Sequence, residues 1–156
     1  MGENEHAASH AGADARALWI VGILALLWSC FGCYDYAMSN MRNIEYIKGA
    51  MPGVDPAAAL AWMDAFPVYA KVGWALGVWG GLLGAILLLI RSRYAVWAFA
   101  ASMLGIILSI GWQLAAAPGL PGANSPMAKI IPFLVIVVGL FLLWYAWAMQ
   151  KRRVLR

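Results

Sequence analysis

The sequence predicts an all-α fold, a four-helix transmembrane bundle with a short interfacial helix between the first and second spans. Of the 156 residues, 64% are hydrophobic and 12% are charged, whereas soluble domains carry about 25% charged residues. The mean hydropathy is +0.76. The apolar residues also form blocks long enough to cross a bilayer, which takes about 20 residues each. We place the four spans at about 17–41, 68–90, 94–116 and 127–149.

These spans leave no room for a separate soluble domain, so we expect a single transmembrane domain over residues 17–150. Residues 1–16 are polar and rich in alanine and glycine, and we expect them to be a disordered cytoplasmic tail. His6 and His10 lie in this tail without further ligands, so we predict no metal site and no cofactor. Residues 151–156 form a basic cytoplasmic tail.

The first span contains both cysteines of the chain, Cys30 and Cys33. A C-x-x-C pair with redox activity usually lies at a helix N-terminus, where the helix dipole lowers the thiol pKa. This pair lies in the middle of a span, and the chain has no second cysteine pair. We therefore expect two buried, inert thiols on a small-residue face with Gly22, Ala25 and Ser29. Redox chemistry is the weaker alternative.

The connection between the first two spans contains a predicted helix over residues 56–66. Asp55 is suited to be its N-cap, and Pro56 suits the first helical position. Pro67 ends the helix. The helix either lies on the membrane plane or covers the outer end of the bundle, and both interpretations keep it at the surface.

The second and third spans carry small residues at helical spacing, which lets helices in a membrane approach closely. The connection over residues 91–93 is short, so the two spans should form an antiparallel hairpin with these faces directed inward and toward each other. The fourth span has bulkier side chains suited to lipid contact. The predicted packing residues are Gly73, Gly77, Gly80, Gly81 and Gly84 in the second span, and Ala98, Ser102, Gly105 and Ser109 in the third.

Basic residues are unevenly divided between the two sides of the membrane, and the side with more of them is usually cytoplasmic. Both termini should therefore be cytoplasmic. This clustering near span ends indicates anchoring on lipid headgroups rather than nucleic-acid binding. The predicted cytoplasmic residues are Arg16, Arg91, Arg93, Lys151, Arg152, Arg153 and Arg156, and the opposite side has Arg42, Lys48, Lys71 and Lys129.

Polar residues should meet at the outer level, opposite the basic side. Asp35 lies about 27 Å along an ideal helix from Ala17, near the outer boundary of the hydrocarbon core. A carboxylate near lipid needs a partner, for which we propose Lys71 or Arg42. The group is either a polar cluster that holds the helices together, which we favour, or a binding site. Its members are Asp35, Tyr36, Ser39, Arg42, Asn43, Lys71 and Gln113, with Lys129 at the same level.

Several short motifs are spread over roughly the first two-thirds of the chain. They are Leu27-Trp28, Asp35 to Ser39, Arg42-Asn43, Tyr46, Phe66-Pro67, Trp74 to Gly81, Leu87 to Leu89 and Arg91 to Arg93. In these motifs the chain resembles a known group of small four-span proteins of the proteobacterial inner membrane, often loosely labelled sugar transporters. The resemblance implies a bacterial inner-membrane location, and it transfers no catalytic residue.

The predicted function is that of a non-enzymatic inner-membrane protein that acts through packing and interaction, in assembly or stress adaptation. No predicted span contains a histidine, which excludes haem held by two histidines. We also find no nucleotide, zinc or nucleophile-elbow motif. The alternatives are a small oligomeric transporter of a sugar-like solute and, second, a thiol or quinone redox protein. The expected partners are the lipid bilayer and a second copy or another membrane protein.

Overall fold

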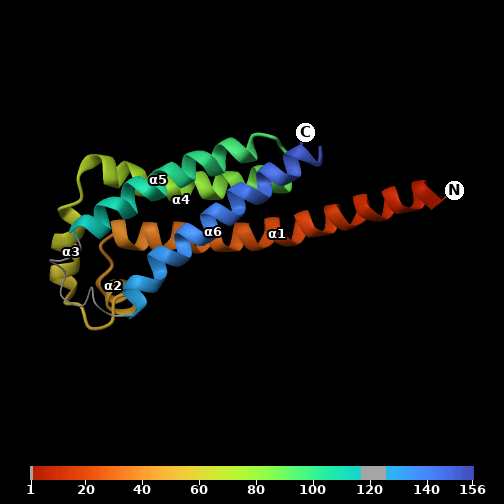
Figure 1. The fold of residues 1–156 in the computed structure, drawn as a ribbon. Coiled ribbons are helices and arrows are strands. Elements are labelled where there is room, and N and C mark those ends of the chain that lie inside the picture. Colours follow the sequence, from red (N-terminus) through yellow and green to blue (C-terminus); the bar gives the residue numbers. More distant parts are fainter. Residues whose placement is uncertain (1, 117–125) are drawn as a thin grey trace.

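The computed structural model describes the backbone of residues 2–116 and 126–156, and the side chains of residues 14–115 and 130–156. This part of the chain is entirely α-helical, as predicted (Figure 1). Its helices are α1 (Gly2–Asn40), α2 (Ile44–Ala50), α3 (Pro56–Asp64), α4 (Val68–Leu89), α5 (Ala95–Ala116) and α6 (Pro126–Lys151).

Four of these helices are long and apolar enough to cross a membrane. Each candidate span has at least 21 residues, which matches the length that a bilayer requires. The four predicted spans are thus confirmed, and the protein is a multi-pass membrane protein. The spans are Asp14–Asn40, Val68–Leu89, Ala95–Ala115 and Ile130–Lys151.

The first helix is longer than the sequence indicated. It begins at Gly2, so backbone that was expected to be disordered over residues 1–16 is helical from residue 2 onward. The physical reason is that this stretch is rich in alanine, the strongest helix former. It also continues a helix that the first span has already nucleated, so only propagation is required. The side chains of His6 and His10 lie outside the described residues.

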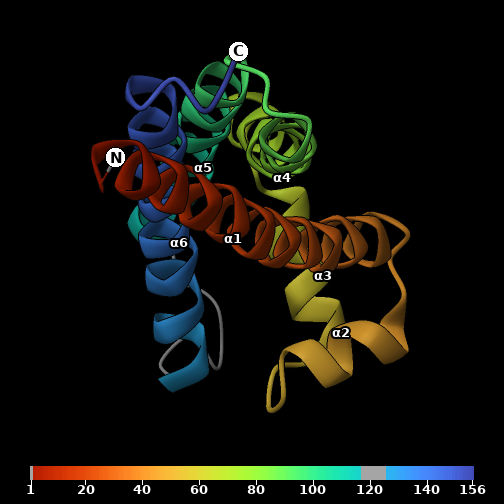
Figure 2. The same cartoon turned by 90° about the vertical axis from the view of Figure 1, so that its right-hand side faces the viewer.

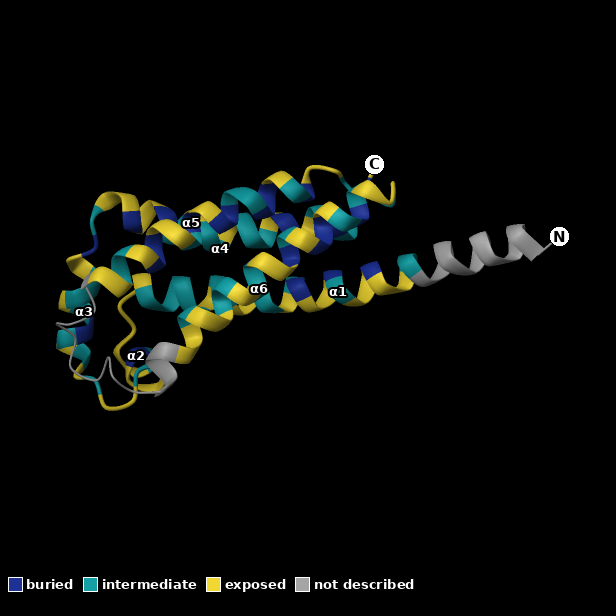
Figure 3. Ribbon diagram, viewed as in Figure 1, coloured by how far each residue is buried: buried dark blue, intermediate teal, exposed yellow. Residues whose placement is uncertain are grey.

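The spanning helices contact one another in the order α1, α4, α5, α6, and the α4–α5 contact is the most extensive. Figure 2 shows α4 and α5 side by side, with α1 and α6 running past them in different directions. The side chains turned away from this arrangement are largely apolar and exposed (Figure 3), among them Ile20, Leu24 and Phe31 on α1 and Phe133 and Leu140 on α6. In a membrane these faces contact lipid.

The α4–α5 contact brings two backbones together. A Cβ atom added to Gly105 would lie 2.5 Å from both the Gly73 carbonyl oxygen and the Gly77 nitrogen. The Ser102 hydroxyl donates a hydrogen bond of 2.6 Å to the Gly77 carbonyl oxygen, which satisfies a polar group inside the apolar segment.

The other small residues of α4 meet α5 and α1. A Cβ on Gly80 would lie 3.1 Å from the Ser102 Cβ, and one on Gly84 would lie 2.7 Å from the Phe99 ring. A Cβ on Gly81 would lie 3.4 Å from the Ser102 hydroxyl of α5 and 3.6 Å from the Ser29 hydroxyl of α1. The small-residue faces of the second and third spans therefore pack against each other, and α1 joins them at Ser29.

All four spans converge at the end that carries the C-terminal residues, which we call the basic end. Leu18 of α1, Leu88 of α4, Phe99 of α5 and Met149 of α6 belong to one buried apolar cluster there. The Arg152 guanidinium also forms an ion pair with the Asp14 carboxylate at 2.9 Å.

The last residue, Arg156, pairs with the α4–α5 connection. Its N–H donates to the Arg91 carbonyl at 2.7 Å, and its own carbonyl accepts from the Arg93 N–H at 2.8 Å. Leu155 is buried beside them. The C-terminal segment therefore closes the basic end of the hairpin.

A methyl group at the α4–α5 contact is expected to separate the helices. Gly105→Ala should lower the free energy of unfolding by about 1–3 kcal/mol, since its Cβ would overlap backbone atoms that cannot move independently. Thermal unfolding in detergent measures this loss. Gly111→Ala, in the same helix with nothing within 4 Å of its Cβ, is the control and should be neutral or slightly stabilising. Equal melting temperatures of Gly105→Ala and Gly111→Ala would refute the close contact between α4 and α5.

Candidate functional site

The short helices α2 and α3 cover the end of the molecule opposite the basic end, which we call the capped end (Figure 1). The Asp55 carboxylate accepts a hydrogen bond from the Ala58 N–H at 3.3 Å, and Pro56 occupies the first position of α3, as predicted. Helix α2 was not predicted, since seven residues give little periodicity. Its main local signal is Asn43, whose side chain accepts from the Tyr46 N–H at 2.9 Å as an N-cap. Glu45 in its first turn and Lys48 in its last turn match the helix dipole.

Helix α1 ends in a left-handed turn at Arg42, which has a φ of 55°. The Arg42 N–H donates to the Ser39 carbonyl at 3.1 Å and the Asn43 N–H to the Met38 carbonyl at 3.2 Å. These two bonds define a Schellman motif, whose left-handed position glycine usually occupies. Placing arginine here costs conformational energy and directs the chain, and with it the guanidinium, toward α3.

Asp64, the last residue of α3, is the meeting point of two cations. Its carboxylate forms an ion pair with the Arg42 guanidinium. Its backbone carbonyl accepts a hydrogen bond from the Lys71 ammonium at 3.2 Å. Both cations approach the C-terminal end of α3, where the helix dipole favours positive charge. Asp64 thus connects the end of α1 to the first turn of α4.

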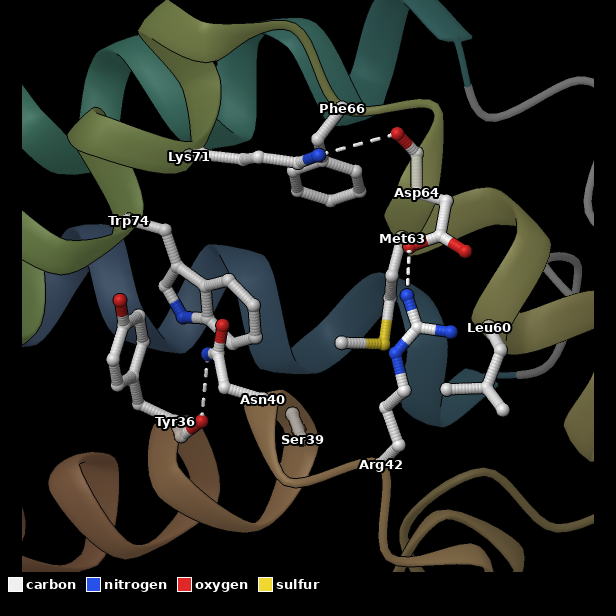
Figure 4. A pocket seen from close by; sticks show the side chains of 10 residues that line it. All are labelled: Tyr36, Ser39, Asn40, Arg42, Leu60, Met63, Asp64, Phe66, Lys71 and Trp74. Carbon is white, nitrogen blue, oxygen red and sulfur yellow. Dashed lines mark hydrogen bonds and ion pairs between the residues drawn. The ribbon is translucent and has the colours of Figure 1, made fainter.

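These groups surround a pocket of about 240 Å³ at the capped end. Figure 4 shows Lys71 reaching the Asp64 carbonyl and Arg42 reaching the Asp64 carboxylate from another side, with Phe66 beside Lys71 and Trp74 next to Tyr36. Pockets for drug-sized ligands have about 300–1,000 Å³, so this one suits only a small group. Its lining residues are Tyr36, Ser39, Asn40, Arg42, Leu60, Met63, Asp64, Phe66, Lys71 and Trp74.

Aromatic rings form one wall of the pocket. Tyr36 and Trp74 meet edge to face with centroids 5.0 Å apart. Phe66 continues the group, 6.2 Å from Trp74 and 4.3 Å from Trp112. Such pairs add to the stability that apolar burial gives. The pocket therefore combines an aromatic wall with a rim of two cations and one carboxylate.

The structure brings together four of the predicted site residues and separates the others. Tyr36, Ser39, Arg42 and Lys71 line the pocket. Asn43 caps α2 instead, and the Gln113 amide donates to the Ser109 hydroxyl of its own helix at 3.1 Å. The side chain of Lys129 lies outside the described residues.

The predicted partner of Asp35, Lys71 or Arg42, is wrong. The Asp35 carboxylate accepts a hydrogen bond of 2.7 Å from the Tyr46 hydroxyl. Arg42 and Lys71 are both directed to Asp64. No sequence pattern pointed to Tyr46, because its position depends on the unpredicted helix α2. Asp64 could have been suspected, since it lies near the end of the helix that Asp55-Pro56 predicted over residues 56–66, although the helix ends two residues earlier than predicted.

Burial raises the pKa of the Tyr46 phenol well above its usual value near 10, and the hydrogen bond to Asp35 raises this pKa further. Tyr46 therefore remains a proton donor to Asp35 at neutral pH. This bond joins α2 to α1.

The two cysteines have different environments. Cys30 is exposed and Cys33 is half-buried, and both are free thiols. The expectation of two buried thiols is therefore wrong for Cys30. The buried face of α1 follows Leu18, Ala25 and Ser29, and Cys30 is about 100° farther around the helix. Among the described residues, no group of three His, Cys, Asp or Glu side chains is close enough to hold a metal ion.

Comparisons with protein-family models, curated proteins and solved structures find no match for this chain. No family is identified by them.

Removing the Tyr46 hydroxyl should loosen α2. Tyr46→Phe is expected to lower the free energy of unfolding by about 1 kcal/mol at neutral pH, because the Asp35 carboxylate loses its donor. Chemical unfolding in detergent measures this loss, with Tyr69→Phe at an exposed tyrosine as the control.

The same hydrogen bond should make stability depend on pH. The pKa of Tyr46 is raised in the folded state, so the stability that the hydrogen bond contributes is complete below a pH of about 10 and is lost as the pH rises further. The difference in the free energy of unfolding between wild type and Tyr46→Phe should therefore shrink above that pH. A difference that grows there would contradict the hydrogen bond between Tyr46 and Asp35.

Proposed function

We propose that this protein is a non-enzymatic component of the bacterial inner membrane that acts through packing and interaction, with its basic end in the cytoplasm. The excess of arginine and lysine at the basic end supports this orientation. C-terminal reporter fusions test it, and a C-terminus outside the cytoplasm would contradict it.

The contact between α4 and α5 carries this proposal. The backbones of Gly73 and Gly77 in the first half of α4 touch that of Gly105 in the middle of α5, so no solute can pass between this pair. The sequence between Lys71 and Arg91 also contains no charged residue. A polar path or a proton relay through the membrane usually requires such residues within the spans.

The polar contacts at the capped end support a structural role. They join the cap segment, residues 44–64, to the spans at three points. Tyr46 bonds to Asp35 of α1, and Asp64 bonds to Arg42 after α1 and to Lys71 of α4. The charged groups of this cluster already have partners within the protein. This arrangement favours a structural role, in which the cluster holds the cap segment in place, over the binding of a ligand.

The second candidate is a small transporter of a sugar-like solute. The pocket favours it, because an aromatic wall beside polar groups suits the apolar face and hydroxyls of a small sugar. Four helices with such close packing would need a second copy to form a path. A thiol redox role rests on Cys30 and Cys33 alone, and an unchanged phenotype of Cys30→Ser would exclude it.

Uptake into proteoliposomes distinguishes the first two functions. Vesicles that contain the full chain should take up labelled sugars and monovalent cations no faster than protein-free vesicles. Saturable uptake would contradict the proposal and establish transport. Trp74→Ala would then test whether the pocket binds the solute, since transport by another route should survive this change.

An exchange of the charges at the capped end tests the structural role. Arg42→Asp and Asp64→Arg should each lower the free energy of unfolding by up to about 1 kcal/mol, as befits a pair whose side chains are 58% and 56% exposed. The double variant should recover most of the loss, because the ion pair can re-form with reversed polarity. Thermal unfolding in a matched detergent measures all three variants. Additive losses in the double variant would show that the pair does not hold the cap segment.

A further inference from the structure

An apolar groove lies between α5 and α6 near the basic end, far from the pocket in the sequence and in the fold. Its cavity volume is about 370 Å³. One lining residue, Val96, belongs to the first turn of α5, and the others belong to the last turns of α6. The lining residues are Val96, Leu140, Leu143, Trp144 and Trp147.

The shape of this groove suits a hydrocarbon chain. From Trp147 to Leu140 the helix rises about 10 Å, which is most of the half-thickness of a hydrocarbon core about 30 Å thick. Every lining side chain is aliphatic or indole. The groove runs from the level of the headgroups at the basic end into one leaflet.

Two cations lie at this end of the groove, which we call its mouth, one in contact with the lining and one close to it in the sequence. The Lys151 ammonium lies 3.5 Å from the centroid of the Trp147 ring, which is itself part of the lining. The Arg93 guanidinium carbon lies 5.4 Å from the centroid of the Tyr94 ring, and Arg93 precedes Val96 by three residues. Contacts with aromatic faces hold cations at the membrane interface.

Neither Lys151 nor Arg93 forms an ion pair with a side chain that the structure describes. Among the side chains that the structure describes at the basic end, the ion pair is formed by Arg152 and Asp14. Lys151 and Arg93 take no part in it and are both exposed. A negatively charged group between them would complete the charge balance.

We propose that this groove binds one anionic phospholipid, with an acyl chain along Leu140, Leu143 and Trp144 and the headgroup phosphate at Lys151 and Arg93. The apolar lining would contact the acyl chain of the lipid, and the two cations would attract a negatively charged headgroup. A free inorganic phosphate has no acyl chain and would leave the groove empty, so a phospholipid is the better fit. The same lining residues on a second copy would bring like charges together, so a lipid fits better than self-association.

Quenching of tryptophan fluorescence by brominated lipids tests the proposal, because Trp144 and Trp147 lie in the groove. The full chain is placed in phosphatidylcholine vesicles with a small fraction of brominated phosphatidylglycerol or, in parallel, of brominated phosphatidylcholine. The anionic lipid should quench at a concentration at least about fivefold lower than the zwitterionic lipid, because each of the two interfacial cations supplies about that factor. Trp144→Phe with Trp147→Phe should remove most of this difference. Equal quenching by both lipids would overturn the proposal.

Two matched pairs of variants separate a built site from a general surface charge. Lys151→Gln with Arg93→Gln should abolish the preference for phosphatidylglycerol. Arg91→Gln with Arg153→Gln removes the same charge at the same end and should retain it. If both pairs lose the preference equally, only the surface potential attracts the lipid and the site is refuted.

A change that fills the groove tests the position of the acyl chain. Leu143→Phe should reduce the preference for the anionic lipid, while Leu134→Phe, at an exposed position of α6 outside the groove, should not. Phenylalanine is used because a new tryptophan would add to the fluorescence that is measured. Unchanged preference in Leu143→Phe would place the lipid elsewhere and overturn the proposal. Because the charge variants leave the packing intact, they decide the question if Leu143→Phe fails to fold.

Discussion

The contact between the backbones of α4 and α5 is the constraint on which the other parts of the structure depend. Lipid chains are as apolar as leucine, so helices in a bilayer gain little by burying apolar side chains against each other. Close packing and interhelical hydrogen bonds must supply the association. Here Gly73, Gly77 and Gly105 allow atomic contact along the helix pair, and the Ser102 hydroxyl adds a bond to the Gly77 carbonyl.

The outer helices α1 and α6 also approach this pair closely at glycine residues, but at fewer positions. A Cβ on Gly22 of α1 would lie 2.6 Å from the Leu89 side chain of α4, and one on Gly139 of α6 would lie 3.0 Å from the Met103 sulfur of α5. Each outer helix leaves a long apolar face exposed. The groove beside Trp147 lies where α6 packs against α5, which is its main neighbour among the described helices.

The position of the α4–α5 pair also determines the arrangement of the capped end. Since α4 begins directly after Phe66 and Pro67, its position sets where α3 ends and thus where Asp64 lies. Helix α1 lies against α4 through Tyr36 and Trp74, so its left-handed turn places Arg42 opposite Asp64. The pocket is therefore a consequence of helix packing, and its charges bind the cap segment to that packing.

The sequence predicted the features that depend on local composition and spacing. The spans follow from runs of apolar residues, and α3 follows from Asp55-Pro56. The partner of Asp35 was missed because Tyr46 reaches it only through a short helix that has no strong sequence signal. The exposure of Cys30 depends on one helical step beyond Ser29, and the sequence alone does not show where the buried face of α1 ends.

Forced unfolding of single molecules in a bilayer, pulled from the C-terminus, tests the central claim most directly. If the α4–α5 contact is the core of the fold, α6 should leave first at low force, and α4 and α5 should then leave together in the step of highest force. Extraction of α5 together with α6, with α4 and α1 remaining as a stable unit, would contradict the account.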